Sequence, residues 1–201
     1  MLFRSSNALR PDGWESGDHA GFPYLVGLLR YEEVAAGEIA HAIRITAHNF
    51  SSLYLWPARH SSGTSADPSL PPMGARFRLK ASFDISGFDA RTQVVLRAFQ
   101  KYGVVLASPG GDWFLQGVSD AGWPDAVINE LRSIVGSNFE AVDTAPLMIN
   151  VNSGQAVQLA PPGGGGGGVT SSGIAQVYDA GVVLAAVVQA NGKVIIGGVF
   201  N

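Results

Sequence analysis

Two histidines and one aspartate are the side chains best suited to acid–base chemistry. His60 and Asp67 share a polar loop that follows a short apolar segment, and functional residues commonly lie in such loops. The imidazole of His60 would exchange protons near neutral pH, and the Asp67 carboxylate would orient it. His41 lies on the apolar face of an expected strand, where a histidine is more often a hydrogen-bonded core residue. His41, His60 and Asp67 are therefore the catalytic candidates, with a structural role as the alternative for each.

A second group of residues would bind a substrate rather than react with it. Arg59, in the same polar loop, would bind an anionic group. Lys80 and Asp84 lie with Arg76 and Arg78 on the charged face of one long expected strand. Cross-strand ion pairs are the ordinary role of such a face, and a basic groove for an acidic polysaccharide is the functional alternative.

Asp112 and Trp113 follow a glycine-rich turn, Ser108-Pro109-Gly110-Gly111. An exposed tryptophan beside a polar group suits stacking on a sugar ring, although most tryptophans are largely buried. Trp14, Trp56 and Trp123 offer the same chemistry. The predicted substrate-binding residues are Arg59, Lys80, Asp84, Asp112 and Trp113.

Several chemistries require residues that this sequence lacks. It has no cysteine, which removes disulfides, thiolate zinc ligands and cysteine nucleophiles. It has no G-x-S-x-G, Walker or H-E-x-x-H motif, and the spacing of its histidines and Asp67 matches no closed metal site. The net charge of -3 gives no reason to expect nucleic acid, and no apolar run is long enough to predict membrane insertion. We expect no cofactor and no metal.

The elements that must position these residues alternate between strands and helices. Residues 75–85 alternate strictly between apolar and polar side chains, which predicts a strand with one buried face. Asp89 is suited to cap a helix that Gly103 ends. Residues 75–143 thus have the order strand, helix, strand, strand, helix, strand, and the expected fold class is α+β, a mainly antiparallel sheet with two helices. The other expected elements are a helical turn at 32–36, strands at 38–46, 53–56 and 139–142, a hairpin of 104–107 with 113–118, and a helix at 125–134.

A proline and glycine run, residues 161–168, separates this part of the chain from its tail. Asn191-Gly192 is a strong type I′ turn signal between two apolar runs, 183–189 and 193–199, and it predicts a C-terminal β-hairpin. Both faces of that hairpin are apolar, so it needs further sheets stacked on it. We expect an α+β domain over residues 1–149, a linker over 150–173 and one hairpin repeat over 174–201.

The tail resembles one delta-60 type β-propeller repeat over residues 182–200. That repeat has an apolar strand, then Q-x-D-G-K, then a second apolar strand that closes in G-G-x-F. The resemblance implies an extracellular scaffold or interaction surface that includes further repeats of the same polypeptide, since one repeat cannot close a propeller. The matching residues are Gln189, Gly192, Lys193, Gly197, Gly198 and Phe200, with Asn191 in place of the usual Asp.

Residues 1–143 contain the stretches Leu29-Arg30-Tyr31-Glu32-Glu33-Val34, Pro57-Ala58-Arg59-His60 and Pro71-Pro72-Met73-Gly74. With these stretches the segment is similar to a domain of unknown function from large secreted bacterial proteins. That family has A-D-N-G-S-x-W in its later hairpin, where this chain has Ala107-Ser108-Pro109-Gly110-Gly111-Asp112-Trp113. This chain has Ser108 and Pro109 in place of that Asp-Asn pair, so it lacks any chemistry that the pair performs in the family. The family pattern also begins upstream of Met1, which predicts an N-terminally truncated domain.

These features favour an extracellular bacterial module that binds or cleaves glycans. Charged residues make up 14% of the chain, which is low for a globular protein, and the sequence has 4 tryptophans. An enzyme of this kind would be a polysaccharide hydrolase or lyase, and the alternative is a non-catalytic adhesion or structural module. The two hypotheses differ in whether His41, His60, Asp67 and Asp84 converge in one cleft.

Overall fold

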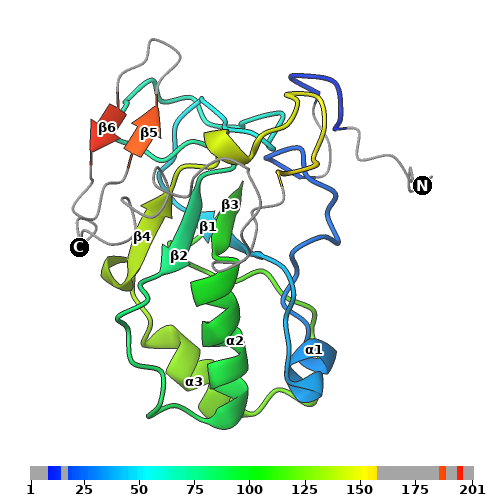
Figure 1. The fold of residues 1–201 in the computed structure, drawn as a ribbon, viewed down its shortest axis with the longest axis vertical. Helices are drawn as coiled ribbons and strands as arrows, with labels where there is room; N and C mark the ends of the chain where they lie inside the picture. The colour runs from blue at the N-terminus through cyan, green and yellow to red at the C-terminus, as the bar shows by residue number, and fades with distance from the viewer. Residues whose placement is uncertain (1–8, 15–17, 158–185, 189–193, 197–201) are drawn as a thin grey trace, which may run out of the picture.

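The computed structural model describes residues 9–14 and 18–157, together with the backbone of residues 186–188 and 194–196. Over residues 9–14 and 18–157 the chain forms an α+β fold with one mixed four-stranded sheet and three α-helices (Figure 1), which confirms the expected fold class. The elements are α1 (Tyr31–Ala36), β1 (Ile43–Ala47), β2 (Arg76–Leu79), α2 (Ala90–Lys101), β3 (Val104–Pro109), α3 (Asp125–Arg132) and β4 (Phe139–Val142), with 3-10 turns at Gly136–Asn138 and Ala145–Leu147.

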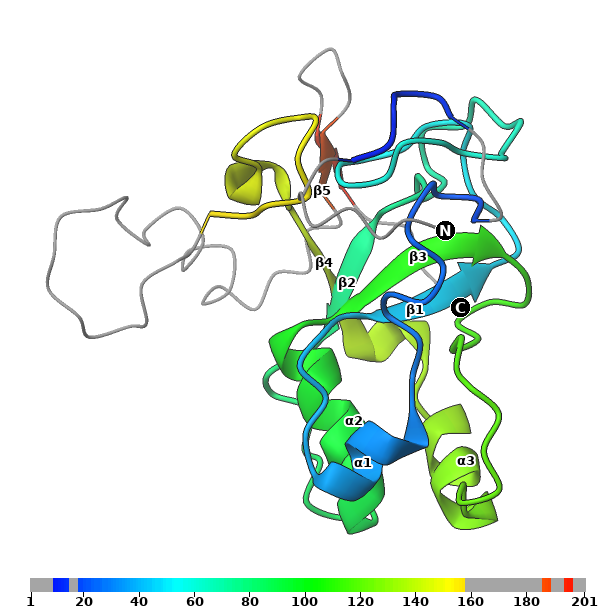
Figure 2. The same cartoon turned by 90° about the vertical axis from the view of Figure 1, so that its right-hand side faces the viewer.

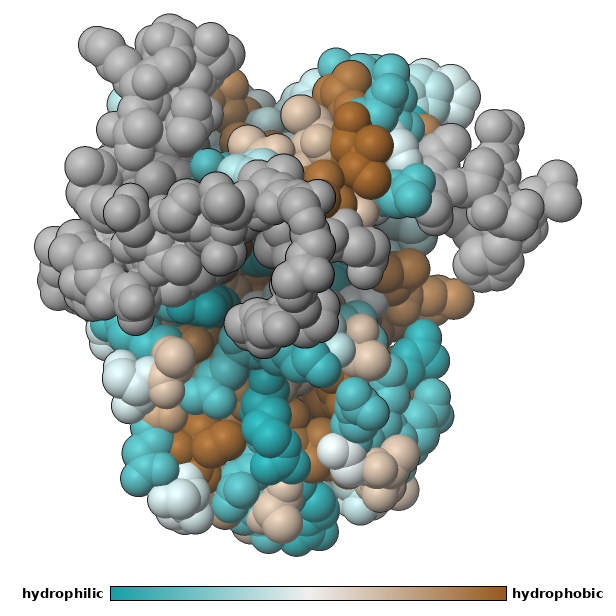
Figure 3. Space-filling view, viewed as in Figure 1, coloured by the Kyte–Doolittle hydropathy of each residue, from teal (hydrophilic) through white to brown (hydrophobic). Residues whose placement is uncertain are grey.

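The sheet has the strand order β1-β3-β2-β4. β1 and β3 are parallel, whereas β2 is antiparallel to both of its neighbours. The three helices lie together on one side of the sheet, and the irregular segments between β1 and β2 lie on the other side (Figures 1 and 2). The outer surface of the helices is mixed, with apolar patches between polar side chains (Figure 3), as expected for helices that bury one face.

β1 is hydrogen-bonded along both of its edges. On the edge away from β3, the Thr46 N–H donates to the Phe114 carbonyl at 3.0 Å, and the Gln116 N–H donates to the Arg44 carbonyl at 2.9 Å. The predicted hairpin of residues 104–107 with 113–118 is therefore wrong. Both edges of β3 are already occupied by β1 and β2, so the returning chain passes the end of β1 and pairs with its free edge instead.

Two expected strands are shorter than the alternation of side chains predicts. β2 is limited to Arg76–Leu79 because its partner β4 pairs only with those residues. Beyond Leu79 the chain turns, and the side-chain amide of Gln100 in α2 donates to the carbonyls of Lys80 and Phe83. The strand expected at 38–46 is β1 alone, so residues 38–42 are irregular, and the strand expected at 53–56 is reduced to one bridge between Tyr54 and Met73.

α2 has the expected cap, core face and end. The Asp89 carboxylate accepts a hydrogen bond from the Arg91 N–H at 2.9 Å, which makes it the N-cap. Val95 and Phe99 are buried in the core, where each contributes about 1.5–3 kcal/mol of transfer free energy. Gly103 ends the helix with a φ of 75°.

In the tail, β5 (Ala186–Val188) and β6 (Val194–Ile196) are antiparallel, with Val188 opposite Val194. The Asn191-Gly192 turn, the hairpin side chains and linker residues 158–173 lie outside the described residues. The two apolar faces of the hairpin and its resemblance to a propeller repeat therefore stay predictions.

Two glycines at helix ends provide a matched test of how closely α2 approaches β2. A Cβ on Gly103 would lie 2.3 Å from the Phe77 carbonyl oxygen, whereas one on Gly37, which ends α1, would have no neighbour within 4 Å. Both residues have a positive φ, so Gly37→Ala should lower the free energy of unfolding by about 1–2 kcal/mol. Gly103→Ala should cost roughly 1–3 kcal/mol more because of the added clash. Urea denaturation would measure both changes, and equal losses would contradict the close backbone contact.

The Asp89 cap predicts a pH dependence in the acid range. Hydrogen bonds from Arg91 lower the pKa of Asp89 to about 2 in the folded chain, from 3.8. A depressed pKa means that the charged cap stabilises the fold above pH 4 and that this contribution is lost as the pH falls toward 2. Asp89→Asn keeps a capping side chain but removes the charge, so the stability difference between wild type and variant should shrink between pH 4 and pH 2. A difference that stays constant over that range would show that the Asp89 charge is irrelevant to α2.

Candidate ligand-binding cavity

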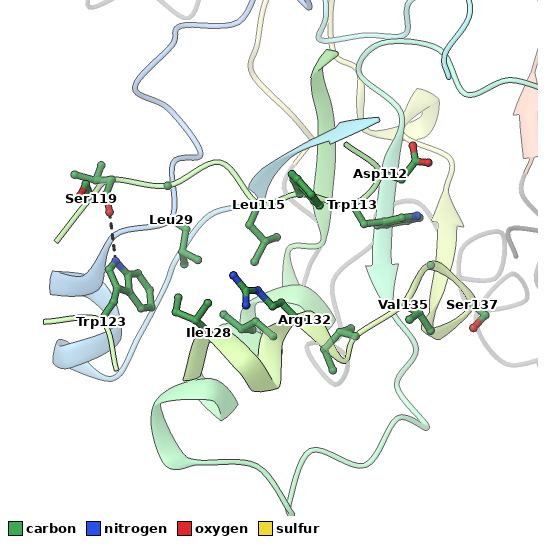
Figure 4. A pocket seen from close by; sticks show the side chains of 16 residues that line it. Leu29, Asp112, Trp113, Leu115, Ser119, Trp123, Ile128, Arg132, Val135 and Ser137 are labelled. Atoms are coloured by element: carbon green, nitrogen blue, oxygen red, sulfur yellow. Dashed lines mark hydrogen bonds between the residues drawn. The ribbon is translucent and has the colours of Figure 1, made fainter. Parts of the chain in front are cut away.

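A cavity of about 850 Å³ opens between residues 112–119 and the segment that runs from α3 to Ser137 (Figure 4). Its volume is within the range of small-molecule sites, roughly 300–1,000 Å³. Most of the lining is apolar, and two tryptophans contribute to it. The main lining side chains are Trp113, Leu115, Trp123, Ile128, Leu131 and Arg132.

The first wall is held by β1 and by aromatic packing on β4. Trp113 has a φ of 60°, a left-handed backbone conformation that costs a non-glycine residue about 1–3 kcal/mol. Its N–H donates to the Thr46 carbonyl at 3.0 Å, and its indole stacks on Phe139 at a centroid distance of 4.8 Å. A Cβ on Gly136 would lie 2.7 Å from the indole nitrogen, so the neighbouring chain leaves room only for glycine. The strained residue thus places an aromatic surface at the cavity.

The second wall is the apolar face of α3. Val127 is fully buried, while Ile128 and Leu131 line the cavity. Trp123, just before the helix, packs edge-on against Tyr31 of α1 at a centroid distance of 5.3 Å. Its indole N–H donates to the Val118 carbonyl at 3.3 Å, which joins the two walls at one end of the cavity (Figure 4).

Few polar groups interrupt this lining. Asp112 and Arg132 are the titratable residues among those that line the cavity. The Asp112 carboxylate accepts a hydrogen bond from the His48 N–H at 2.7 Å, and Arg132 donates to the Asn129 side chain at 3.4 Å. Phe114 also lines the cavity and is 67% exposed. The arrangement is suited to bind a molecule with an apolar face, and it contains no acid–base pair of two carboxylates or of carboxylate and histidine.

The predicted catalytic residue His41 lies between α1 and β1, and its side chain is hydrogen-bonded to both α1 and the residue that precedes β1. Its Nε2 is hydrogen-bonded to the Glu33 carboxylate at 3.1 Å, and its Nδ1 to the Ala42 carbonyl at 2.9 Å. The side chain is about one quarter exposed and precedes β1 rather than lying on a strand face, so the expected strand position is wrong.

His60 is hydrogen-bonded to a distant segment of the chain, whereas Asp67 is hydrogen-bonded within its own loop. His60 Nδ1 is hydrogen-bonded to the His19 carbonyl at 3.0 Å. Asp67 is exposed and accepts hydrogen bonds from the Ser69 N–H at 2.9 Å and the Ser69 hydroxyl at 2.7 Å. The backbone hydrogen bond from Ser69 lowers the pKa of Asp67, which favours the ionised form of this carboxyl.

The predicted substrate-binding residue Arg59 is buried and joins three segments. It is 4% exposed, and its guanidinium donates to the carbonyls of Arg10 and Val151 at 2.8 and 3.0 Å and to the Asn152 side chain at 3.0 Å. The Asp12 carboxylate lies 3.6 Å away. Arg59 therefore fixes residues 150–152, within the expected linker, to the body of the fold.

Of the four charged residues expected on one strand face, Arg76 and Arg78 lie on β2, whereas Lys80 and Asp84 follow its end, so their expected strand position is wrong. Arg78 pairs with Glu140, which lies directly opposite on β4. Lys80 donates to the Ser137 carbonyl at 2.8 Å, and Asp84 accepts from the Ser86 N–H at 2.9 Å within its own turn. That backbone hydrogen bond lowers the pKa of Asp84.

The structure does not bring the predicted catalytic residues together. His41 contacts α1 at one end of the molecule, whereas the loop of residues 60–73 lies at the opposite end (Figures 1 and 2). Of the eight predicted site residues, Asp112 and Trp113 line the cavity. Over residues 9–14 and 18–157, no cluster of three histidine, aspartate or glutamate side chains is placed to hold a metal ion. No helix in the described part of the chain is long and apolar enough to span a membrane.

Arg132 and Phe114 are cavity residues that the sequence did not indicate. Arg132 comes directly after Leu131, an apolar residue of the predicted helix, and this position next to the apolar face is the feature of the sequence that could have indicated it. Phe114 carries no local signal, because its place depends on pairing of residues 113–117 with β1.

Comparisons with known proteins give no relative from which to transfer a role: no family model, no curated protein and no solved structure matches the chain.

Arg59 should contribute to stability rather than to binding. Arg59→Met would remove three hydrogen bonds from a buried cation, to the Arg10 and Val151 carbonyls and the Asn152 side chain, so the free energy of unfolding should fall by about 3 kcal/mol or more. Lys80→Met is the matched control, since Lys80 makes one exposed hydrogen bond and its loss should cost less than about 1 kcal/mol. Urea denaturation, with amide exchange at residues 150–152, would measure the effects. A stable Arg59→Met variant with unchanged exchange there would refute the structural role.

Proposed function

We propose that this chain is a non-catalytic glycan-binding module of an extracellular bacterial protein, and that the cavity beside α3 is its binding site. The observation that carries the proposal is an open, mostly apolar cavity of about 850 Å³ with Trp113 and Trp123 in its lining. The C–H faces of sugar rings stack on such aromatic surfaces, and the polar side chains of Asp112, Ser119 and Ser137 are available to hydroxyl groups.

Binding is favoured over cleavage because the cavity lacks the groups that cleavage needs. Glycoside hydrolysis ordinarily uses two carboxylates about 5–9.5 Å apart across the scissile bond. The lining has one carboxylate, Asp112, and no histidine. His41, which was expected as an acid or base, is already hydrogen-bonded through both ring nitrogens.

A protein-binding adhesion module is the second candidate, in keeping with the propeller-like tail. It is favoured by the exposed apolar side chains beside the cavity, since Phe114 is 67% and Val135 52% exposed. Large exposed apolar side chains that gather at one place commonly mark an interaction surface.

A glycan array probed with the intact chain tests the proposal. We expect selective binding of one glycan class, and loss of that binding in Trp123→Ala and in Phe114→Ser, because both changes remove apolar contact area. Phe114 is mostly exposed, so its variant should fold normally. The matched controls are Trp14→Ala, which removes a 61% exposed tryptophan that does not line the cavity, and His60→Ala; both should bind like wild type. Absence of any glycan hit, or equal loss in the Trp14 control, would overturn the proposed function.

A further inference from the structure

Arg132 is a solvent-exposed residue whose side chain lines the cavity. Figure 4 shows it between the side chains of Leu29, Leu115 and Ile128, which come from three different segments. Its hydrogen bond to Asn129 is long, at 3.4 Å, and no ion pair with a described carboxylate holds it. A guanidinium that pairs with no described carboxylate can bind an anion, and a ligand whose apolar face fills the cavity beside it would exclude water from that pair.

The one carboxylate of the lining, Asp112, lies away from Arg132 in the cavity. Asp112 is on the far side of Trp113 from Arg132 (Figure 4), and its carboxylate is already engaged by the His48 N–H at 2.7 Å. The cavity thus has one cation and one carboxylate at separate places in a mostly apolar lining. This charge arrangement would orient a ligand that carries one anionic group next to an apolar face.

We propose that the ligand of this cavity carries a carboxylate that pairs with Arg132 while its apolar face packs against the side chains of Leu115, Ile128 and Trp123. The inference rests on the proposed function in using the same cavity, and it names the ligand class. A guanidinium binds a carboxylate through two parallel hydrogen bonds, which gives a direction as well as an affinity. The same chemistry is present in a uronic acid residue of an acidic glycan and in the head group of a small amphipathic acid.

Calorimetric titration of the intact chain with four probes separates these sources. The glycan pair is an oligogalacturonate and its carboxyl-reduced, neutral counterpart, and the small-molecule pair is decanoate and decanol. We expect an acidic probe to bind more tightly than its neutral partner and to lose affinity as the salt concentration rises. Arg132→Gln should weaken binding of the acidic probe by roughly tenfold to a hundredfold, the value of a charge-assisted hydrogen bond, and should leave its neutral partner unchanged.

Arg97→Gln is the matched control. Arg97 is an exposed arginine of α2 whose guanidinium makes a similarly long hydrogen bond, 3.5 Å to Gln93, and it does not line the cavity. Its replacement changes the net charge by the same amount as Arg132→Gln and should leave every titration unchanged.

The results of these titrations distinguish a failure of the carboxylate assignment from a failure of the proposed glycan-binding function. Binding of the acidic glycan that depends on Arg132 supports both proposals, whereas binding of decanoate alone supports the carboxylate assignment and overturns the glycan function. Equal binding of acidic and neutral glycans, unaffected by Arg132→Gln, overturns the carboxylate assignment and leaves the glycan function standing. Binding of none of the four probes overturns the carboxylate assignment, and the glycan array then decides the function independently.

Discussion

The buried guanidinium of Arg44 is the interaction on which this arrangement of the chain depends. It is 1% exposed, pairs with the equally buried Asp18, and donates through Nε to the Gln116 side chain at 3.0 Å. One side chain therefore joins the segment before α1, the strand β1 and the first wall of the cavity. Gly27 approaches so closely that a Cβ there would lie 2.9 Å from Arg44 Cγ. An uncompensated buried charge costs about 3–5 kcal/mol, so these segments must assemble together.

The cavity follows from that assembly. Because Gln116 is bound to Arg44 through both its backbone and its side chain, the segment from Trp113 to Gly117 has a fixed register along β1. A fixed register is what allows Trp113 to keep a left-handed conformation, since the hydrogen bond to Thr46 and the stacking on Phe139 offset its strain. α3 packs on α2, and the space between α3 and this rigid segment stays open as the cavity.

The sequence predicts the parts of this fold that local chemistry determines. α2 has its cap at Asp89 and its end at Gly103, and β4 has the predicted bounds, because these signals lie within a few residues of the elements they control. Pairings between distant segments were not predictable in this way. Residues 113–118 are apolar enough for a hairpin, but the occupied edges of β3 decide against it. The burial of Arg44 was also missed, since its alternation with Ile43 and Ile45 indicates a solvated face that in the folded chain is covered by residues 18–27.

The same distinction explains why the structure does not bring most of the predicted site residues together. His41, Arg59 and Asp67 have side chains capable of chemistry, and in the folded chain their hydrogen-bonding groups are used to fix loops and helices. No motif in the sequence indicates Arg132 as a site residue. In the folded chain it lies beside apolar side chains and makes one long hydrogen bond, to Asn129. A polar side chain is available to a ligand when the fold has not already satisfied it. Residue type identifies which side chains could react, whereas the remaining capacity to bind depends on tertiary contacts that residue type does not encode.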